Sequence, residues 1–318
     1  MTVAPPRPTG LETDFAGLHL AHPVLNGSGT WDAIAAVRTF GAPARDQLPF
    51  AAFVSKTITL APRGGNHPPR LWETPAGLIN SIGLPNKGLE GFLARDLPEL
   101  ATLPVPLIVS VAGFSHEEFA TLVEAVADRA EVAALELNVS CPNVKSGCVI
   151  GSERGEMAAL MSSVRPLTSK PLIVKLTPNV TDVVPVARAA EDAGADALSL
   201  INTLRATAID PHGGKPWLGA GQGGLSGPAV RPVALALTAQ VAARTQLPIV
   251  GMGGIQGGRD ALDFMQAGAT CVAVGTESFR DPAAATRVRH ELAQQLHLHG
   301  INSPADATAL ARQRLSNV

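Results

Sequence analysis

The stretch EDAGADALSL (residues 191–200) leads from the end of a helix directly into an aliphatic strand. Gly194 can stop the helix, because glycine readily adopts the left-handed conformation found just after many helices. The same arrangement recurs in MQAGATCVAV (residues 265–274), where Gly268 stands in the place of Gly194. These two copies predict a recurring unit in which a helix is followed by a buried strand.

The strands of these two copies are among eight short runs of the chain that are rich in β-forming residues and bounded by Pro or Gly. Most are near-continuous aliphatic runs, as expected for parallel strands covered on both faces. Helical stretches separate most of them, and Ser115 with Glu118 forms a capping-box pattern at the start of one helix. The runs are residues 23–29, 51–59, 106–113, 134–140, 171–178, 197–203, 248–254 and 271–277. The alternation predicts an α/β fold, a (β/α)8 TIM barrel, rather than a doubly wound sheet.

The bulk properties narrow the class of protein. With 318 residues, 46% apolar and 16% charged, the chain can bury a large core, and we expect a single barrel domain over residues 1–318 with a flexible leader at residues 1–10. A net charge of −2 without a basic run predicts no nucleic-acid partner. The sequence shows no signal peptide and no apolar stretch near the ~20 residues of a membrane span, so we expect a cytoplasmic protein. Its three cysteines form neither a disulfide framework nor a paired metal site.

Nearly every predicted strand ends in a polar residue or glycine. In a barrel these ends meet at one mouth, where such folds keep their chemistry. Each residue alone also fits an ordinary role, such as a turn cap or a solvated lysine, and the joint arrangement is the stronger signal. The residues are Ser28, Lys56, Ser110, Asn138, Lys175, Asn202, Gly253 and Gly275.

Glycines end the last two predicted strands, in GMGG (251–254) and VGT (274–276). Loops there often bind phosphate, because glycine lets backbone N–H groups approach an anion closely, although tight turns alone would also explain them. A further glycine cluster at 219–224 fits GxGxxG but follows no clear strand of a β–α–β unit. We therefore expect a flexible loop there and reject a dinucleotide-binding reading.

Several strand ends taken together resemble the class 1 dihydroorotate dehydrogenases, flavin enzymes of pyrimidine synthesis. The sequence looks most like the catalytic subunit of their NAD-linked branch. The matching motifs span most of the chain in the right order: NGSGT (26–30), SKTIT (55–59), ETPAGLINSIGLPN (73–86), ELNVSCPNVKSG (136–147), KLTPNV (175–180), INT (201–203), GGLSGPA (223–229), GMGGI (251–255) and VGT (274–276).

The resemblance implies FMN at the barrel mouth and assigns a site to it. Its FMN contacts would be Ser28, Lys56, Thr57, Asn138, Lys175, Ile201, Gly227, Gly253, Gly254, Gly275 and Thr276. The pyrimidine would be held by Lys56, Asn80, Ser81, Ile82, Gly83, Leu84, Asn138, Asn143, Asn202 and Thr203, with Cys141 as the catalytic base. One departure is visible: the family commonly has Asn where this chain has Ser110, so we expect no direct contact between Ser110 and the flavin.

The implied chemistry explains these residue types. Oxidising dihydroorotate removes a proton from carbon 5, which needs a base, and a hydride from carbon 6, which needs the flavin. A thiol with a reference pKa near ~8.5 can serve once partly ionised. Amides match the donors and acceptors of a pyrimidine ring. Lys56 could meet the substrate carboxylate or a flavin oxygen, and Lys175 could stabilise the anionic reduced flavin near N1.

Three other readings remain open. Lys175 could form a Schiff base, as in barrel aldolases; the chain could be a related FMN-dependent dihydropyrimidine dehydrogenase; or it could be a non-catalytic flavin-binding subunit. The resemblance also implies partners: dihydroorotate and orotate, a homodimeric core, and a second subunit with FAD and an iron–sulfur cluster through which NAD is reduced. No membrane partner is expected.

Overall fold

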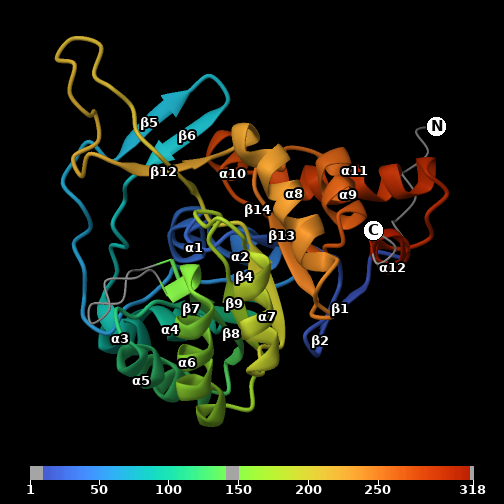
Figure 1. The fold of residues 1–318 in the computed structure, drawn as a ribbon, viewed down its shortest axis with the longest axis horizontal. Helices are drawn as coiled ribbons and strands as arrows, with labels where there is room; N and C mark the ends of the chain where they lie inside the picture. The colour runs from blue at the N-terminus through green and yellow to red at the C-terminus, as the bar shows by residue number, and fades with distance from the viewer. Residues whose placement is uncertain (1–9, 141–149, 316–318) are drawn as a thin grey trace.

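Eight parallel strands form a nearly closed barrel in the computed structural model, which describes residues 10–140 and 150–315 (Figure 1). Their order around the sheet is β3-β14-β13-β10-β9-β8-β7-β4, and Ala51 N donates to Val24 O at 3.0 Å between the two end strands. They are β3 (Val24–Asn26), β4 (Phe53–Val54), β7 (Leu107–Val111), β8 (Val132–Asn138), β9 (Leu172–Lys175), β10 (Ala197–Leu200), β13 (Ile249–Met252) and β14 (Cys271–Val274). Each overlaps one predicted run, and the predicted (β/α)8 barrel is confirmed.

Helices follow the strands and surround the barrel (Figure 1). They are α1 (Ala33–Phe40), α2 (Ala42–Asp46), α3 (Gly88–Gly91), a π-helical segment (Phe92–Asp96), α4 (Leu97–Leu100), α5 (His116–Ala127), α6 (Arg154–Val164), α7 (Val184–Asp192), α8 (Arg231–Ala242), α9 (Gly258–Gln266), α10 (Glu277–Arg280), α11 (Ala284–Leu298) and α12 (Pro304–Leu315). Short 3₁₀ turns cover Ile150–Ser152, Arg165–Leu167 and Pro228–Val230. No helix in the described residues is long and apolar enough to span a membrane.

The predicted helix ends are present. Ser115 Oγ accepts from Glu118 N at 3.2 Å, while the Glu118 carboxylate reaches one residue further back and accepts from Phe114 N. Gly194 and Gly268 have φ of +90° and +98° and follow α7 and α9 directly after their caps. Ser115 therefore marks the start of α5, and Gly194 and Gly268 mark the ends of α7 and α9 just before the strands that follow them.

A short hairpin closes the bottom of the barrel. Strands β1 (Thr13–Phe15) and β2 (Leu18–Leu20) are antiparallel, and Phe15 and Leu20 pack with the apolar residues of the barrel interior. Both side chains are at most 1% exposed. This hairpin was not predicted from the sequence.

A second, antiparallel sheet stands beside the barrel mouth (Figure 1). Its order is β11-β12-β6-β5, with β5 (Leu71–Thr74), β6 (Gly77–Asn80), β11 (Leu204–Ala206) and β12 (Gly223–Ser226). Segments 71–80 and 204–226, which lie far apart in the sequence, thus pair with each other beside the mouth. The loop predicted at 219–224 is partly wrong, because Gly223 and Gly224 belong to β12. A Cβ on Gly224 would lie 1.9 Å from Thr203 Oγ1, so the close approach of β12 requires glycine.

Candidate active site

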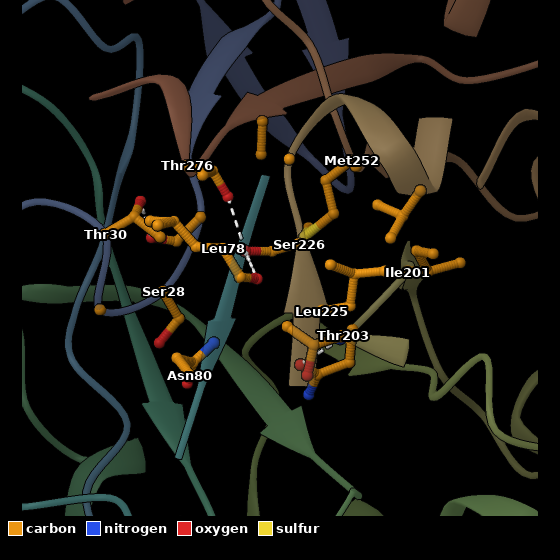
Figure 2. Close-up of a pocket in the computed structure, with 18 of the residues that line it drawn as sticks. Ser28, Thr30, Leu78, Asn80, Ile201, Thr203, Leu225, Ser226, Met252 and Thr276 are labelled. Atoms are coloured by element: carbon orange, nitrogen blue, oxygen red, sulfur yellow. Dashed lines mark hydrogen bonds between the residues drawn. The ribbon is translucent and has the colours of Figure 1, made fainter. Parts of the chain in front are cut away.

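A pocket of about 560 Å³ opens where the carboxyl ends of the barrel strands meet the four-stranded sheet (Figure 2). This volume is in the range of small-molecule and cofactor sites. Ser28, Thr203 and Thr276 follow barrel strands, whereas Leu78, Asn80 and Leu225 come from the added sheet (Figure 2). The barrel therefore supplies the floor of the pocket and the added sheet supplies a wall.

Most of the residues predicted for the site line this pocket. They are Ser28, Lys56, Thr57, Asn80, Ile82, Gly83, Leu84, Asn138, Lys175, Ile201, Asn202, Thr203, Gly227, Gly253, Gly254, Gly275 and Thr276. Ser81 does not line it, because its Oγ accepts from Asn66 Nδ2 at 2.9 Å. Cys141 and Asn143 lie outside the described residues.

Hydroxyl groups run from the pocket wall into the barrel. Ser28 Oγ lies 3.0 Å from Thr57 Oγ1, which lies 2.9 Å from Ser110 Oγ. Ser110 is fully buried and its Oγ donates to Glu136 Oε1 at 3.1 Å. Ser110 does not line the pocket.

The amide side chains are held by one another and by the backbone. Asn202 Nδ2 donates to Asn138 Oδ1 at 3.1 Å and to Ser140 Oγ at 2.7 Å. Asn80 Nδ2 donates to Gly224 O at 3.3 Å across the small sheet. Because these bonds fix the orientation of the amides before a ligand arrives, the amides form a preorganised set of donors and acceptors.

Two lysines give the pocket a positive floor. Lys175 is 7% exposed and its Nζ lies 4.0 Å from Glu136 Oε1. The Lys56 side chain is reached by solvent through the pocket but is surrounded by protein atoms. The protein atoms around the Lys56 ammonium group partly remove it from water. This desolvation, and then the positive charge of Lys175, lower the pKa of Lys56 below its usual value. An anionic group in the pocket would relieve the repulsion between the two ammonium groups.

Glycines at the ends of β13 and β14 form a cradle for an anion. Gly254 has φ of +77°, and a Cβ there would lie 2.7 Å from Gly227 O, so both the conformation and the space require glycine. Within the described part of the chain, no hydrogen bond satisfies the backbone N–H groups of Gly254, Gly275 and Thr276. Unpaired N–H groups at a close-approach loop suit a phosphate.

Apolar side chains complete the pocket, and the sequence analysis had not assigned them to it. Leu78, Leu225 and Met252 line it together with the predicted Ile201 (Figure 2). They offer a surface on which a flat ring system can pack. Ser226 was also missed; its Oγ accepts from Thr276 Oγ1 at 2.8 Å and joins the added sheet to the glycine cradle (Figure 2). A glycine cradle, an apolar wall and two cations together fit a cofactor that carries a phosphate and a flat ring, such as a flavin.

Comparison with known proteins adds independent evidence. The family model described as dihydroorotate dehydrogenase matches residues 10–296. The chain belongs to the dihydroorotate dehydrogenase family. It is 47% identical over 292 residues to a protein of Geobacter sp. (strain M21) named dihydroorotate dehydrogenase B (NAD(+)), catalytic subunit, covering 91% of this chain and 93% of that protein. It is 50% identical over 291 residues to a protein of the same name from Desulforudis audaxviator (strain MP104C), covering 90% and 92%.

The dihydroorotate dehydrogenase match includes every structural part of the pocket. It begins before β1 and ends within α11, so it contains all eight barrel strands and the four-stranded sheet. Only the end of α11 and α12 lie beyond it among the described elements. The two predicted residues that the structure does not describe, Cys141 and Asn143, fall within the matched range.

Proposed function

We propose that this chain oxidises dihydroorotate to orotate with FMN bound at the barrel mouth. The observation that carries the proposal is the composition of one pocket: a glycine cradle, an apolar wall, fixed amides and two lysines, in a chain of the dihydroorotate dehydrogenase family. When bound, FMN would supply the acceptor for the hydride from carbon 6. The residues of the chain would bind the cofactor and the substrate, orient them, and remove the proton from carbon 5.

The cofactor would be held at two places. The N–H groups of Gly254, Gly275 and Thr276 would bind its phosphate, and Ser28, Thr57, Asn138 and Lys175 would face its ring. Lys175 would favour the reduced, anionic form, because a buried cation stabilises negative charge in a site of low polarity. We include Lys56, Ile201, Gly227 and Gly253 among the contacts, since they line the same pocket.

The substrate would be recognised by its charge and its ring edges. Lys56 would meet the carboxylate, and Asn80, Asn138, Asn202 and Thr203 would match the donors and acceptors of the pyrimidine. Residues 82–84 line the same pocket. We keep Ser81 and Asn143 as proposed contacts, with Ser81 acting through its loop because its hydroxyl bonds Asn66.

Cys141 is our proposed general base for carbon 5. Its neighbour Ser140 is the last described residue before it, and Ser140 Oγ accepts from Asn202 Nδ2. The amide that we assign to substrate binding therefore also holds the start of the Cys141 segment. A thiol near its reference pKa of ~8.5 can take the proton once ionised.

The competing aldolase reading is less well supported by the surroundings of Lys175. A Schiff base requires an amine that is free to attack a carbonyl, whereas Lys175 Nζ forms an ion pair with the Glu136 carboxylate at 4.0 Å. A dihydropyrimidine dehydrogenase would use the same pocket without needing Lys56 for a carboxylate. The charge of the substrate therefore separates the two flavin-based readings.

The electron acceptor and assembly are also proposals. Relatives are named as catalytic subunits of an NAD(+) enzyme, and we propose that this chain passes electrons to a separate subunit that carries FAD and an iron–sulfur cluster. Three cysteines are fewer than the four thiolates that usually hold such a cluster, so the cluster would belong to the partner. We propose a homodimeric core, a cytoplasmic location, and a single domain over residues 1–318.

The test is a pair of titrations of the FMN-loaded protein, with orotate and with uracil, followed by the flavin spectrum. We expect orotate to perturb the spectrum at concentrations at least tenfold lower than uracil, because only orotate carries the carboxylate that Lys56 would pair with. Equal or tighter binding of uracil would favour the dihydropyrimidine reading. Borohydride trapping of a carbonyl compound on Lys175 would favour the aldolase.

A further inference from the structure

Glu136 carries a carboxylate that is buried in the barrel beneath the pocket, and it has no part in the proposed reaction. It is 3% exposed. A buried carboxylate is costly unless it is paired and hydrogen-bonded. Each of its oxygens accepts a hydroxyl: Oε1 from Ser110 Oγ at 3.1 Å and Oε2 from Ser199 Oγ at 3.0 Å. Strand β7, next to β8, and strand β10, on the far side of β9, thus supply the hydrogen bonds that keep a charge at this position.

The cation nearest to this carboxylate belongs to the pocket. Lys175 Nζ lies 4.0 Å from Glu136 Oε1, and Lys175 itself lines the pocket. In the β8–β9 ladder Asn138 pairs with Lys175, and Glu136 lies two residues earlier on the same strand face. The carboxylate therefore approaches the ammonium from the barrel side, leaving the pocket side of the ammonium for a ligand.

We propose that Glu136 is a positioning residue that directs Lys175 into the pocket and partly offsets its charge, so that the pocket favours an anionic ring less strongly than an unpaired Lys175 would. The effect on the ring rests on the proposed function, in which that ring is the reduced cofactor. The effect on Lys175 does not, because it follows from the geometry of Glu136, Ser110 and Ser199. Ser110 has a specific part: its hydroxyl bonds both Glu136 and Thr57, and so joins the carboxylate to the pocket wall.

The first experiment measures the titration of Lys175 without any cofactor. Competitive labelling with acetic anhydride across a pH series, read by mass spectrometry, reports the pH at which each lysine becomes reactive. In Glu136→Gln, which keeps the shape but removes the charge, we expect the Lys175 midpoint to fall by about one pH unit or more. Exposed Lys215 serves as the internal reference and should not move.

Two variants separate charge from shape. Glu277→Gln removes another buried carboxylate at the pocket, one that pairs with Arg280 and Arg287, and should leave the Lys175 midpoint unchanged. Glu136→Asp keeps the charge but withdraws it, and should move the midpoint in the same direction by less. It also provides the test should Glu136→Gln fail to fold. An unchanged Lys175 midpoint in the folded Glu136 variant would overturn the proposal.

The second experiment measures the midpoint potential of bound FMN at pH 6 in the parent protein and in Glu136→Gln. Without the opposing carboxylate, the charge of Lys175 acts on the ring in full. We expect the preference for the reduced form to rise about tenfold, a positive shift of about 30 mV for two electrons. If the pH midpoint of Lys175 shifts but the protein binds no FMN, the role of Glu136 is supported and the proposed function is contradicted. If the pH midpoint shifts and FMN binds, but the potential of FMN is unchanged, the effect on the ring is overturned.

Discussion

The two ends of the barrel are built from different residues and carry different tasks. At the bottom, the β1–β2 hairpin places Phe15 and Leu20 against a fully apolar cluster, and Cys271 lies buried within it. Burial raises the pKa of that thiol far above its usual range, which keeps Cys271 an inert apolar residue. At the mouth, the same strands end in hydroxyls, amides, lysines and glycines around a pocket.

Residues that stabilise the fold and residues that form the site therefore lie at opposite ends of the same strands. Within β8, the residues change from packing the core to forming the site over a few positions. Ala134 belongs to the lower apolar cluster, Glu136 pairs with Lys175, and Asn138 lines the pocket. Substitutions at the bottom should therefore change the free energy of unfolding. Substitutions at the mouth should change binding and reaction while the protein stays folded.

The largest effect should come from Cys141→Ala. Removing the proposed base should slow reduction of bound flavin by dihydroorotate by about 10²–10⁴-fold, the usual contribution of general base catalysis. Flavin content and thermal stability should remain close to those of the parent protein. Anaerobic rapid mixing followed at the flavin absorbance measures this rate. Undiminished reduction would remove Cys141 from its proposed role.

The second effect concerns one phenylalanine at each end. Phe15 is fully buried at the bottom, and Phe15→Ala should cost about 3–5 kcal/mol of unfolding free energy through lost packing and a cavity. Phe279 lies at the pocket rim and is 62% exposed, so Phe279→Ala should stay within about 0.5 kcal/mol. Denaturant titration measures both. Similar losses at the two positions would break the contrast.

The third effect is the acid sensitivity of the bottom. Burial, and then the charge of Arg289, lower the pKa of His22 to about 4, and its Nδ1 accepts from Val24 N at 3.3 Å. The unfolded chain therefore binds more protons than the folded one between pH 6.5 and 4, and stability falls as the pH drops through this window. The loss attributable to His22 should approach about 3 kcal/mol.

The matched variant for this prediction is His22→Gln. The difference in unfolding free energy between the parent and His22→Gln should change with pH across the window, while other titrating groups cancel. Denaturant titrations at pH 7, 5 and 4 measure it. A difference that stays constant over these pH values would show that His22 carries no such linkage.

The smallest effect compares two glycines of similar conformation. Gly17 (φ +80°) turns the bottom hairpin, with nothing within 4 Å of an added Cβ, so Gly17→Ala should cost only about 1–2 kcal/mol of stability. Gly254→Ala combines similar strain with a contact at 2.7 Å in the anion cradle, and should also weaken FMN binding about tenfold or more. Fluorescence titration with FMN should show no change for Gly17→Ala. Equal affinities in the two variants would remove Gly254 from the cradle.

The parts of the fold that local sequence determines were predictable. Continuous aliphatic runs fixed the eight strands because a strand buried on both faces needs apolar residues throughout. Gly194 and Gly268 marked helix ends because few other residues tolerate their backbone conformation. The bottom hairpin was missed because its strands have three residues each, and Asp14 and His19 interrupt their apolar pattern.

The parts of the site that depend on distant pairing were not predictable. The wall formed by Leu78 and Leu225 exists only because β6 pairs with β12, some 140 residues further along the chain. Glu136 looked like one polar residue within a strand, and its role depends on Ser110, Ser199 and Lys175 on three other strands of the barrel. The predicted site residues that do line the pocket came from motifs at strand ends, which a barrel gathers at one face.

The most direct test of the account is the anaerobic visible spectrum of the purified chain, supplemented with FMN, before and after addition of dihydroorotate. We predict a flavin band that bleaches, because the mouth would bind the cofactor and deliver the substrate hydride to it. A band that persists would contradict the proposed substrate while retaining the cofactor. Folded protein that binds no FMN would contradict the assignment of the mouth altogether.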